Sequence, residues 1–275
     1  MTTHRDAVPE HVVRQTPQWI ADDLRRGGRF VGSFVQIPSQ SSCEAMALTS
    51  AFDVLCVEAE HSPLGRADVD ALVRTISLAG LPCLVRVASH QPAEIAAALD
   101  AGAAGIIVPR VESRPEAERV CQAAHFPPRG VRGIGPSRAT AYGRGIERYR
   151  HEALAQTLVC LQIETRQGVM NLNEILSVSG VDLIFVGPGD LAGSLGMVGG
   201  DGVDLRREVA KIRRKSIQAD KLAGIYASTL QEANRYFRQG FDLVIVGSDL
   251  HFLNVGIQRE IGARQRRISR GSGAR

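Results

Sequence analysis

Residues 157–196 read TLVCLQIETRQGVMNLNEILSVSGVDLIFVGPGDLAGSLG, in which two hydrophobic runs of strand length flank one run of helix length. The first run, 157–164, and the second, 182–187, predict β-strands joined by a helix. Strands connected in this way are parallel. Glu164 closes the first strand, and Asp190 follows the second in a Gly-Pro-Gly turn that opens another helix. Because the carboxyl ends of parallel strands meet at one edge, the two carboxylates are predicted neighbours.

The same alternation continues along the whole chain. Eight hydrophobic runs predict strands at 29–37, 53–58, 82–88, 104–109, 157–164, 182–187, 222–227 and 242–247. Amphipathic runs predict helices at 42–51, 66–79, 92–101, 113–124, 166–179, 204–219, 229–239 and 249–268, with an extra leading helix at 17–27. Eight such units predict an α/β fold, a closed (β/α)8 TIM barrel with an extra N-terminal helix. The alternative is a doubly wound open sheet, but no strand is followed by G-x-G-x-x-G, and no nucleotide cofactor is expected.

The length of 275 residues fits one domain of this kind. We expect a disordered or frayed tail at 1–16, a single catalytic barrel at 17–268 and a basic tail at 269–275. No apolar run reaches the roughly 18 residues of a membrane span. The first fifteen residues lack the apolar core of a signal peptide, so a cytoplasmic protein is expected. The five cysteines show no C-x-x-C spacing and predict reduced core residues.

The formal net charge of +4 is concentrated near the C-terminal end, where residues 259–275 hold six Arg and one Glu. The rest of the chain therefore sums to about −1. A short basic segment of this kind is expected to be solvated. Neither nucleic acid nor a membrane is an expected partner.

Polar side chains gather where the predicted strands end. In a barrel these ends form one face, and catalytic residues lie there. The residues are Glu58, Glu60, His61, Arg86, Gln162, Glu164, Asp190 and Asp249. Carboxylates without cysteine favour a hard ion, Mg²⁺ or Mn²⁺, over zinc. Each residue alone has an ordinary interpretation, such as a helix cap for Asp190 or a turn residue for His61. Their convergence on one face favours a catalytic site.

Lysine is rare in the chain and is predicted to lie away from this face. Only Lys211, Lys215 and Lys221 occur, two in a predicted helix and one just before the seventh strand, at the opposite end of the barrel. No lysine is therefore placed to form a Schiff base. If the site stabilises a carbanion equivalent, the electron sink must be a metal ion.

Six segments together resemble the class II, metal-dependent pyruvate aldolases of the HpcH/HpaI aldolase/citrate lyase family. They are FDVLCVEAEHSP, LVRV, GAAGIIVPRVES, FPPRGVRGIGPSRATAYG, LQIETRQGVMNLNEILSVSGVDLIFVGPGDLAGSLG and FDLVIVGSD, within roughly residues 19–262. The most specific parts are E-H-[SA]-P, Q-x-E-T and G-P-x-D-L-x-x-S-L-G. The resemblance implies reversible cleavage of a 4-hydroxy-2-oxo acid to pyruvate and an aldehyde through a metal-bound pyruvate enolate. Because loss of carbon dioxide from oxaloacetate would give the same enolate, decarboxylation of oxaloacetate is also expected.

The resemblance implies a role for each matching residue. Glu164 and Asp190 would bind the metal, Mg²⁺ or Mn²⁺ with Co²⁺ as a further candidate. Arg86 would steady the enolate oxygen, and His61 would serve acid–base chemistry on the aldol hydroxyl. The substrate-binding residues would be Gln162, Gly187, Pro188, Gly189 and Asp190.

The resemblance also implies supporting residues and an assembly. Glu58 and Glu60 would orient the catalytic groups without contacting the substrate themselves. Many family members have Asp where this chain has Glu58, and the extra methylene is expected to alter the geometry on the acceptor side. A homohexamer, a dimer of trimers, is the implied assembly.

Alternatives depend on the longest interruption, 126–156, which begins FPPRGVRGIGPSRATAYGRG. We interpret it as a long βα connection at the catalytic face, a lid or binding loop. Its arginines could bind the phosphates of a CoA ester in a citrate-synthase-like or CoA-ester lyase, grip a carboxylated aldehyde, or stay solvated. They are Arg129, Arg132, Arg138 and Arg144. A non-catalytic barrel that binds 2-oxo acids is the remaining alternative.

Overall fold

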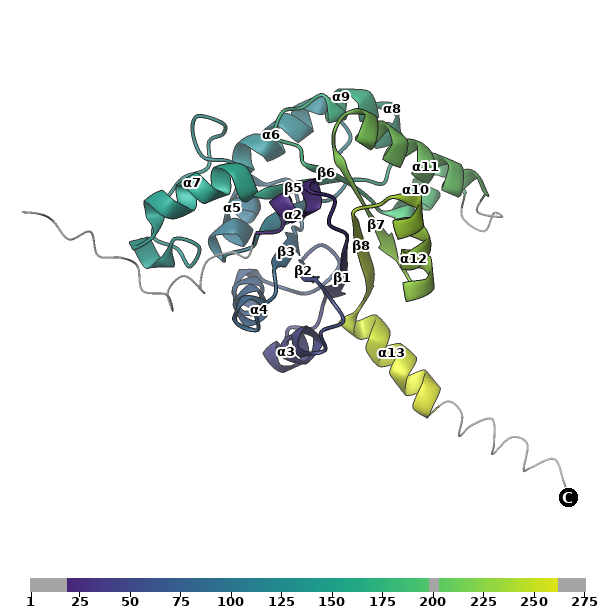
Figure 1. The fold of residues 1–275 in the computed structure, drawn as a ribbon, viewed down its shortest axis with the longest axis horizontal. Coiled ribbons are helices and arrows are strands. Elements are labelled where there is room, and N and C mark those ends of the chain that lie inside the picture. Colours follow the sequence, from purple (N-terminus) through teal and green to yellow (C-terminus); the bar gives the residue numbers. More distant parts are fainter. Residues whose placement is uncertain (1–18, 198–202, 262–275) are drawn as a thin grey trace, which may run out of the picture.

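Eight parallel strands close into a barrel in chain order, with β8 paired to β1, in the computed structural model of the protein (Figure 1). The structure describes residues 19–197 and 203–261. The strands are β1 Phe30–Val35, β2 Val54–Glu58, β3 Cys83–Arg86, β4 Gly105–Val108, β5 Leu158–Ile163, β6 Leu183–Val186, β7 Leu222–Ala227 and β8 Leu243–Ser248. Each overlaps its predicted range, and the predicted (β/α)8 barrel is confirmed.

The helices surround the barrel (Figure 1). They are α3 Gln40–Leu48, α4 Arg66–Leu78, α5 Pro92–Asp100, α6 Arg114–Ala124, α7 Ile146–Gln156, α8 Arg166–Met170, α9 Leu172–Leu176, α10 Pro188–Leu195, α11 Val203–Gln218, α12 Leu230–Gln239 and α13 Asp249–Glu260, with a 3₁₀ turn η1 at Ala141–Gly143. Helix α2, Ala21–Arg25, precedes β1 as predicted, although it is shorter than 17–27. The predicted tails at 1–16 and 269–275, and the predicted end of the last helix at 262–268, lie outside the described residues.

The single helix predicted at 166–179 is wrong, because α8 ends at Met170 and α9 begins at Leu172, with Asn171 as the cap between them. The Asn171 side-chain amide donates a hydrogen bond of 2.7 Å to the carbonyl oxygen of Glu112, which follows β4. Asparagine readily leaves a helix when its side chain finds such a partner. The break therefore ties the β5–β6 crossover to the end of β4.

The segment 126–156 does not lie at the catalytic face, contrary to its prediction as a βα connection. It joins the end of α6 to the start of β5, so it runs at the N-terminal end of the barrel. There Arg132 Nη2 contacts Asp100 Oδ1 at 2.6 Å, and Arg138 Nη1 donates to the carbonyl oxygen of Ala101 at 3.0 Å. Asp100 is the last residue of α5, and Ala101 follows it in the connection to β4. Glycine and proline in the first half of the segment indicate a loop, and the prediction extended that loop over the second half, where α7 lies.

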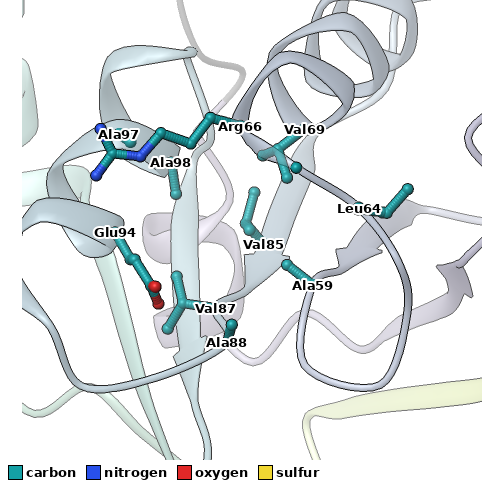
Figure 2. Close-up of a pocket in the computed structure, with 11 residues that line it drawn as sticks. Ala59, Leu64, Arg66, Val69, Val85, Val87, Ala88, Glu94, Ala97 and Ala98 are labelled. Atoms are coloured by element: carbon teal, nitrogen blue, oxygen red, sulfur yellow. The ribbon is translucent and has the colours of Figure 1, made fainter.

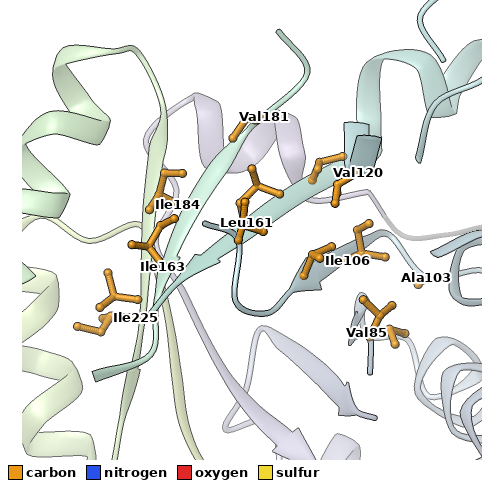
Figure 3. Packing of buried hydrophobic residues seen from close by; sticks show 14 of the residues in the cluster. Val85, Ala103, Ile106, Val120, Leu161, Ile163, Val181, Ile184 and Ile225 are labelled. Atoms are coloured by element: carbon orange, nitrogen blue, oxygen red, sulfur yellow. The ribbon is translucent and has the colours of Figure 1, made fainter. Parts of the chain in front are cut away.

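Alternation along the strands divides the apolar core into two parts. Outward side chains such as Val85, Ile106 and Leu161 pack under the helices (Figure 3). The inward side chains form the inner core with Ile20, Ala21 and Leu24. They are Phe34, Val54, Cys56, Leu84, Ile107, Leu158, Cys160, Leu183, Phe185, Leu243 and Ile245. Because side chains alternate with a period of two, the next inward positions at the C-terminal end include 58, 86 and 162.

The cysteines are free and buried, in agreement with the prediction; they are Cys43, Cys56, Cys83, Cys121 and Cys160. Burial raises the pKa of the Cys43 and Cys121 thiols to about 12, so neither is a thiolate near neutral pH. Within the described ranges, every helix is too short or too polar to cross a membrane.

Candidate active site at the C-terminal end of the barrel

Strand register brings the first site residues together. Glu58 at the end of β2 is paired in register with Arg86 at the end of β3. Cys56 and Leu84, two positions earlier, belong to the inner core, so both charged side chains continue the inward row. Gln162 follows the inward Cys160 on β5 in the same way. Polar groups thus form the upper layer of an otherwise apolar barrel.

Arg86 is the centre of this layer. Its guanidinium forms an ion pair with Glu58, lies 3.4 Å from Glu60 Oε2 through Nε, and donates to Gln162 Oε1 at 3.4 Å. The same group lies 4.4 Å above the ring centroid of Phe34. Burial lowers the pKa of Arg86, but the carboxylates of Glu58 and Glu60 outweigh burial and raise it. The site therefore holds one permanently charged cation.

Glu58 shapes the loop after β2 as well as holding Arg86. Its Oε1 accepts hydrogen bonds from the backbone N–H groups of Glu60, at 2.7 Å, and His61, at 3.1 Å. Its backbone carbonyl accepts a further hydrogen bond from the Ser62 hydroxyl. A fully buried carboxylate therefore fixes the loop that carries both Glu60 and His61.

Glu60 links the guanidinium to the imidazole. Its Oε2 lies 3.4 Å from Arg86 Nε and 3.5 Å from His61 Nε2. Burial raises the pKa of the Glu60 carboxyl, against the lowering effects of Arg86 and His61. The His61 side chain is 59% exposed, whereas that of Glu60 is 10% exposed. The imidazole is therefore open to a substrate on one side and backed by a carboxylate on the other.

Glu164 is held by two donors. Its Oε1 accepts from the backbone N–H of Arg110 at 2.9 Å, and its Oε2 accepts from the side-chain amide of Gln162. Burial raises the pKa of the Glu164 carboxyl, against the hydrogen bond from Gln162, and the charges of Glu60 and Asp190 add to the rise. Gln162 thus connects Glu164 to Arg86.

Gly187 and the first turn of α10 complete this side of the site. A Cβ atom on Gly187 would lie 2.5 Å from Glu164 Oε2, so only glycine fits beside the carboxylate. Gly187 is the N-cap of α10, Pro188 opens the helix, and Asp190 lies in its first turn. Backbone N–H groups at a helix N-terminus attract anions. The arrangement therefore places an anion-binding turn beside Glu164.

The two predicted metal ligands fit a hard divalent cation. Glu164 and Asp190 offer only oxygen, and the negative charge of Asp190 acts on Glu164. Glycine at 187 leaves space against Glu164 Oε2 that any side chain would fill. In the described part of the chain, no three His, Cys, Asp or Glu side chains gather as a complete ligand set. Two carboxylates, with water or substrate oxygens, suit Mg²⁺ or Mn²⁺, which keep several exchangeable ligands.

A cavity of about 260 Å³ opens at this end of the barrel. Its walls include the predicted residues His61, Arg86, Gly187, Pro188, Gly189 and Asp190. They also include residues that the sequence analysis missed: Phe34, Gln36, Phe185, Tyr226, Gly247 and Ser248. Tyr226 lies near the end of the predicted strand 222–227, so the alternation of side chains along that strand predicts that it points into the barrel. It was missed because the candidates chosen at strand ends are mainly charged residues.

Several predicted candidates lie elsewhere or have structural partners. The carboxylate of Asp249 accepts from the backbone N–H groups of Gln36, Ile37 and Leu250, so it fastens the end of β1 to the start of α13. The arginines of segment 126–156 lie with that segment at the opposite end of the barrel. Arg132 and Arg138 are buried there. No arginine groove for a CoA ester therefore forms within one described chain.

A second cavity, of about 230 Å³, lies outside the barrel between β3, α4 and α5 (Figure 2). Its walls are mainly aliphatic, and Figure 2 shows Val69, Val85 and Val87 among them. The two charged residues each have a partner: Arg66 donates to the Ala93 carbonyl, and Glu94 accepts from the Ser89 hydroxyl. Catalysis needs convergent polar groups, which the first cavity provides and this aliphatic cavity does not.

Comparisons with known proteins concern the family and the fold. A family profile described as HpcH/HpaI aldolase/citrate lyase matches residues 31–254. A hydroxypyruvate/pyruvate aldolase of Rhizorhabdus wittichii is 34% identical over 84% of the chain and 92% of its own length. A 4-hydroxy-2-oxo-heptane-1,7-dioate aldolase of Klebsiella pneumoniae is 33% identical over 86% of the chain and 90% of its own length. A solved HpcH/HpaI aldolase/citrate lyase family protein from Burkholderia cenocepacia has a TM-score of 0.82 and 33% identity, covering 90% of this chain and 98% of its own.

Proposed function

This chain belongs to the HpcH/HpaI aldolase/citrate lyase family, and from that premise we propose that it is a metal-dependent aldolase cleaving a 4-hydroxy-2-oxo acid reversibly to pyruvate and an aldehyde. One observation carries the proposal: a continuous line of contacts from Glu164 through Gln162, Arg86 and Glu60 to His61. This line joins the groups needed for the pyruvate half of the reaction to those needed for the aldehyde half.

Glu164 and Asp190 would hold the divalent metal, Mg²⁺ or Mn²⁺, with Co²⁺ as a further candidate. When bound, that ion supplies a Lewis acid for the keto group of the 2-oxo acid. The backbone N–H groups of Gly189 and Asp190, at the start of α10, bind the substrate carboxylate. Gln162 holds Glu164 in place and bonds to Arg86, so it keeps the two groups in fixed relation.

Arg86 stabilises the charge that develops on the pyruvyl oxygen. Its pKa is raised, so the guanidinium remains protonated throughout. Its contacts with Glu58 and Glu60 and its position over Phe34 fix its orientation before substrate arrives. Preorganised charge of this kind stabilises a transition state without reorganisation.

His61 takes the proton from the C4 hydroxyl as the C3–C4 bond breaks, and the bonding electrons pass into the pyruvate enolate. Glu60, 3.5 Å from His61 Nε2, stabilises the imidazolium that results. Protonation at C3 then gives pyruvate. The same enolate arises when oxaloacetate loses carbon dioxide, so we include oxaloacetate decarboxylation in the proposal.

The test is exchange of the pyruvate methyl protons in deuterated buffer with Mg²⁺ or Mn²⁺. Wild-type protein is expected to catalyse this exchange, and Arg86→Ala to abolish it. Arg119→Ala, an exposed arginine on α6, is the matched control and should exchange like wild type. Undiminished exchange by Arg86→Ala would remove the assigned role of Arg86, and a wild-type protein that does not exchange would remove the proposed function.

We further propose that the chain forms a homohexamer, a dimer of trimers. Helix α13 extends away from the barrel (Figure 1). Its Leu250, Leu253 and Ile257, at spacings of three and four residues on one face, are 42%, 53% and 52% exposed. Apolar side chains gathered on a projecting helix are typical of subunit contacts. Sedimentation velocity should give a hexamer for the wild type and smaller species for Leu253→Asp, and a monomeric wild type would exclude this assembly.

A further inference from the structure

One peptide group, that between Pro109 and Arg110, connects the loop after β3 to Glu164. β4 ends at Val108, and these two residues follow it directly. The carbonyl oxygen of Pro109 accepts a hydrogen bond from His90 Nε2 at 2.5 Å. The backbone N–H of Arg110 donates to Glu164 Oε1 at 2.9 Å. Both ends of the same peptide group are therefore engaged, one by an imidazole and the other by a proposed metal ligand.

The geometry of a peptide group makes these two contacts interdependent. The Pro109–Arg110 bond is trans, and a trans peptide is planar with its C=O and N–H pointing in opposite directions. Because a carbonyl oxygen only accepts, His90 Nε2 carries the proton in this contact. A hydrogen bond that fixes the Pro109 carbonyl therefore also fixes the direction of the Arg110 N–H.

The backbone at Arg110 needs this support. Its φ of 52° lies in the left-handed region, which a residue with a Cβ atom seldom adopts. Such conformations persist only where the surroundings hold them, and they gather at functional sites. Pro109 is buried, so without the imidazole its carbonyl oxygen would lose a hydrogen bond away from water. The contact with His90 thus helps to hold a strained turn that directs an N–H at Glu164.

His90 is itself fixed by its neighbours on both sides. Ser89 Oγ donates to Glu94 Oε2 at 2.9 Å and accepts from the backbone N–H of Gln91 at 3.2 Å. Gln91 is the N-cap of α5, and Glu94 lies in the first turn of that helix. The start of α5 therefore supports the loop that presents the imidazole to Pro109.

We propose that His90 is a positioning residue for Glu164 and acts through the Pro109–Arg110 peptide group. This inference rests on the proposed metal site and adds a residue of the β3–α5 loop to it. The Arg110 N–H holds Oε1 of the carboxylate, while Oε2 lies on the side of Gly187. Removing an outer partner that orients a metal ligand typically weakens metal binding by roughly 10–100-fold.

The experiment measures Mn²⁺ binding to the full-length protein by isothermal titration. His90→Phe keeps an aromatic ring but removes the N–H, so it should bind Mn²⁺ about tenfold more weakly than the wild type. His90→Gln places an amide donor near the position of Nε2 and should restore most of the affinity. His90→Ala adds no bulk and should show the same loss as His90→Phe, so it replaces that variant if the larger side chain prevents folding. His151→Phe, at an exposed histidine of α7, is the matched control and should bind like the wild type.

Pyruvate methyl-proton exchange gives the second readout. The Mn²⁺ concentration for half-maximal exchange should rise in His90→Phe by the same factor as the dissociation constant. Wild-type Mn²⁺ affinity in the Phe and Ala variants would overturn the inference. An equal loss in His90→Gln would also overturn it, because a purely structural effect does not depend on the donor. If the wild type binds Mn²⁺ and exchanges protons, either result defeats this inference alone, whereas a wild type that does neither defeats the aldolase function and this inference with it.

Discussion

Gly187→Ala is the substitution for which the structure gives the sharpest expectation. The new Cβ would lie 2.5 Å from Glu164 Oε2 and 3.2 Å from Gln162 Nε2. Ordinary contacts begin at 3.4 Å, so the carboxylate or the turn must move by about 0.9 Å. The φ of −94° at Gly187 is open to alanine, so backbone strain adds nothing. The effect therefore falls on the positions of Glu164 and, to a smaller extent, Gln162.

A displacement of this size should be costly for catalysis and mild for folding. Misplacing a reacting group by about 1 Å costs on the order of 10²-fold in rate. We therefore expect pyruvate methyl-proton exchange to fall by about two orders of magnitude, and Mn²⁺ binding, measured by isothermal titration, to weaken by about tenfold or more. Overpacking should lower the free energy of unfolding by about 1–3 kcal/mol, which leaves the protein folded at 25 °C.

The control lies farther along the same helix, outside the cavity. A Cβ on Gly193 meets nothing within 4 Å, so Gly193→Ala adds the same methyl group to α10 without touching Glu164 or the cavity. It should bind Mn²⁺ and exchange pyruvate protons as the wild type does. Identical Mn²⁺ affinity and exchange rates in the two variants would refute the placement of Glu164 as a metal ligand beside Gly187.

The remaining predictions concern the ion pair, the imidazole and pH. Glu58→Gln leaves the buried Arg86 guanidinium with the more distant Glu60 as its carboxylate, so urea unfolding should show a free energy of unfolding lower by about 3–5 kcal/mol. The control, Glu118→Gln, breaks an exposed ion pair with Arg114 and should leave the free energy of unfolding nearly unchanged. Equal losses in the two variants would contradict the burial argument. His61→Ala should lower aldol cleavage by about 10²–10⁴-fold and spare oxaloacetate decarboxylation, which has no C4 hydroxyl; parallel losses would reject that division. The pKa of Glu164 in the folded protein is raised above its ordinary 4.5. The stability that Glu164 contributes to the metal-free protein is therefore fully present below pH 4.5 and is lost as the pH rises through the raised pKa. Thermal melts of metal-free Glu164→Gln should lack this loss, and a pH profile equal to that of the wild type would show that Glu164 is not its source.

The barrel could be predicted because its signal is repeated. Each of eight strands carries its own hydrophobic run, so an error of a residue or two at one end, as at 82–88 against Cys83–Arg86, leaves the topology unchanged. The strand-end rule then placed Glu58, Arg86 and Gln162 at one face, and the structure brings them into contact. Their catalytic roles stay predictions, because contact alone does not establish chemistry.

Two features could not be read from hydrophobic pattern in the same way. The position of segment 126–156 follows from connectivity, since a segment between α6 and β5 must run at the N-terminal end of the barrel, whereas composition suggested a lid. Gln36 lies two positions after the inward Phe34, just beyond the end of β1, and lines the cavity. Its inward direction follows from the period of two, but an uncharged side chain at a strand end does not by itself indicate a site.

Glu58 acquires a different meaning from its contacts than from its sequence. From the sequence, the extra methylene suggested a larger effect on the acceptor side than on the donor side, through the orientation of His61. In the structure one carboxylate oxygen accepts from the backbone of Glu60 and His61, while the side chain also forms the ion pair with Arg86. A shorter aspartate would have to give up reach toward the loop or toward the guanidinium. Glu58 therefore couples Arg86, the group proposed to stabilise the enolate, to the loop that carries His61, and under the proposed mechanism its length bears on both halves of the reaction.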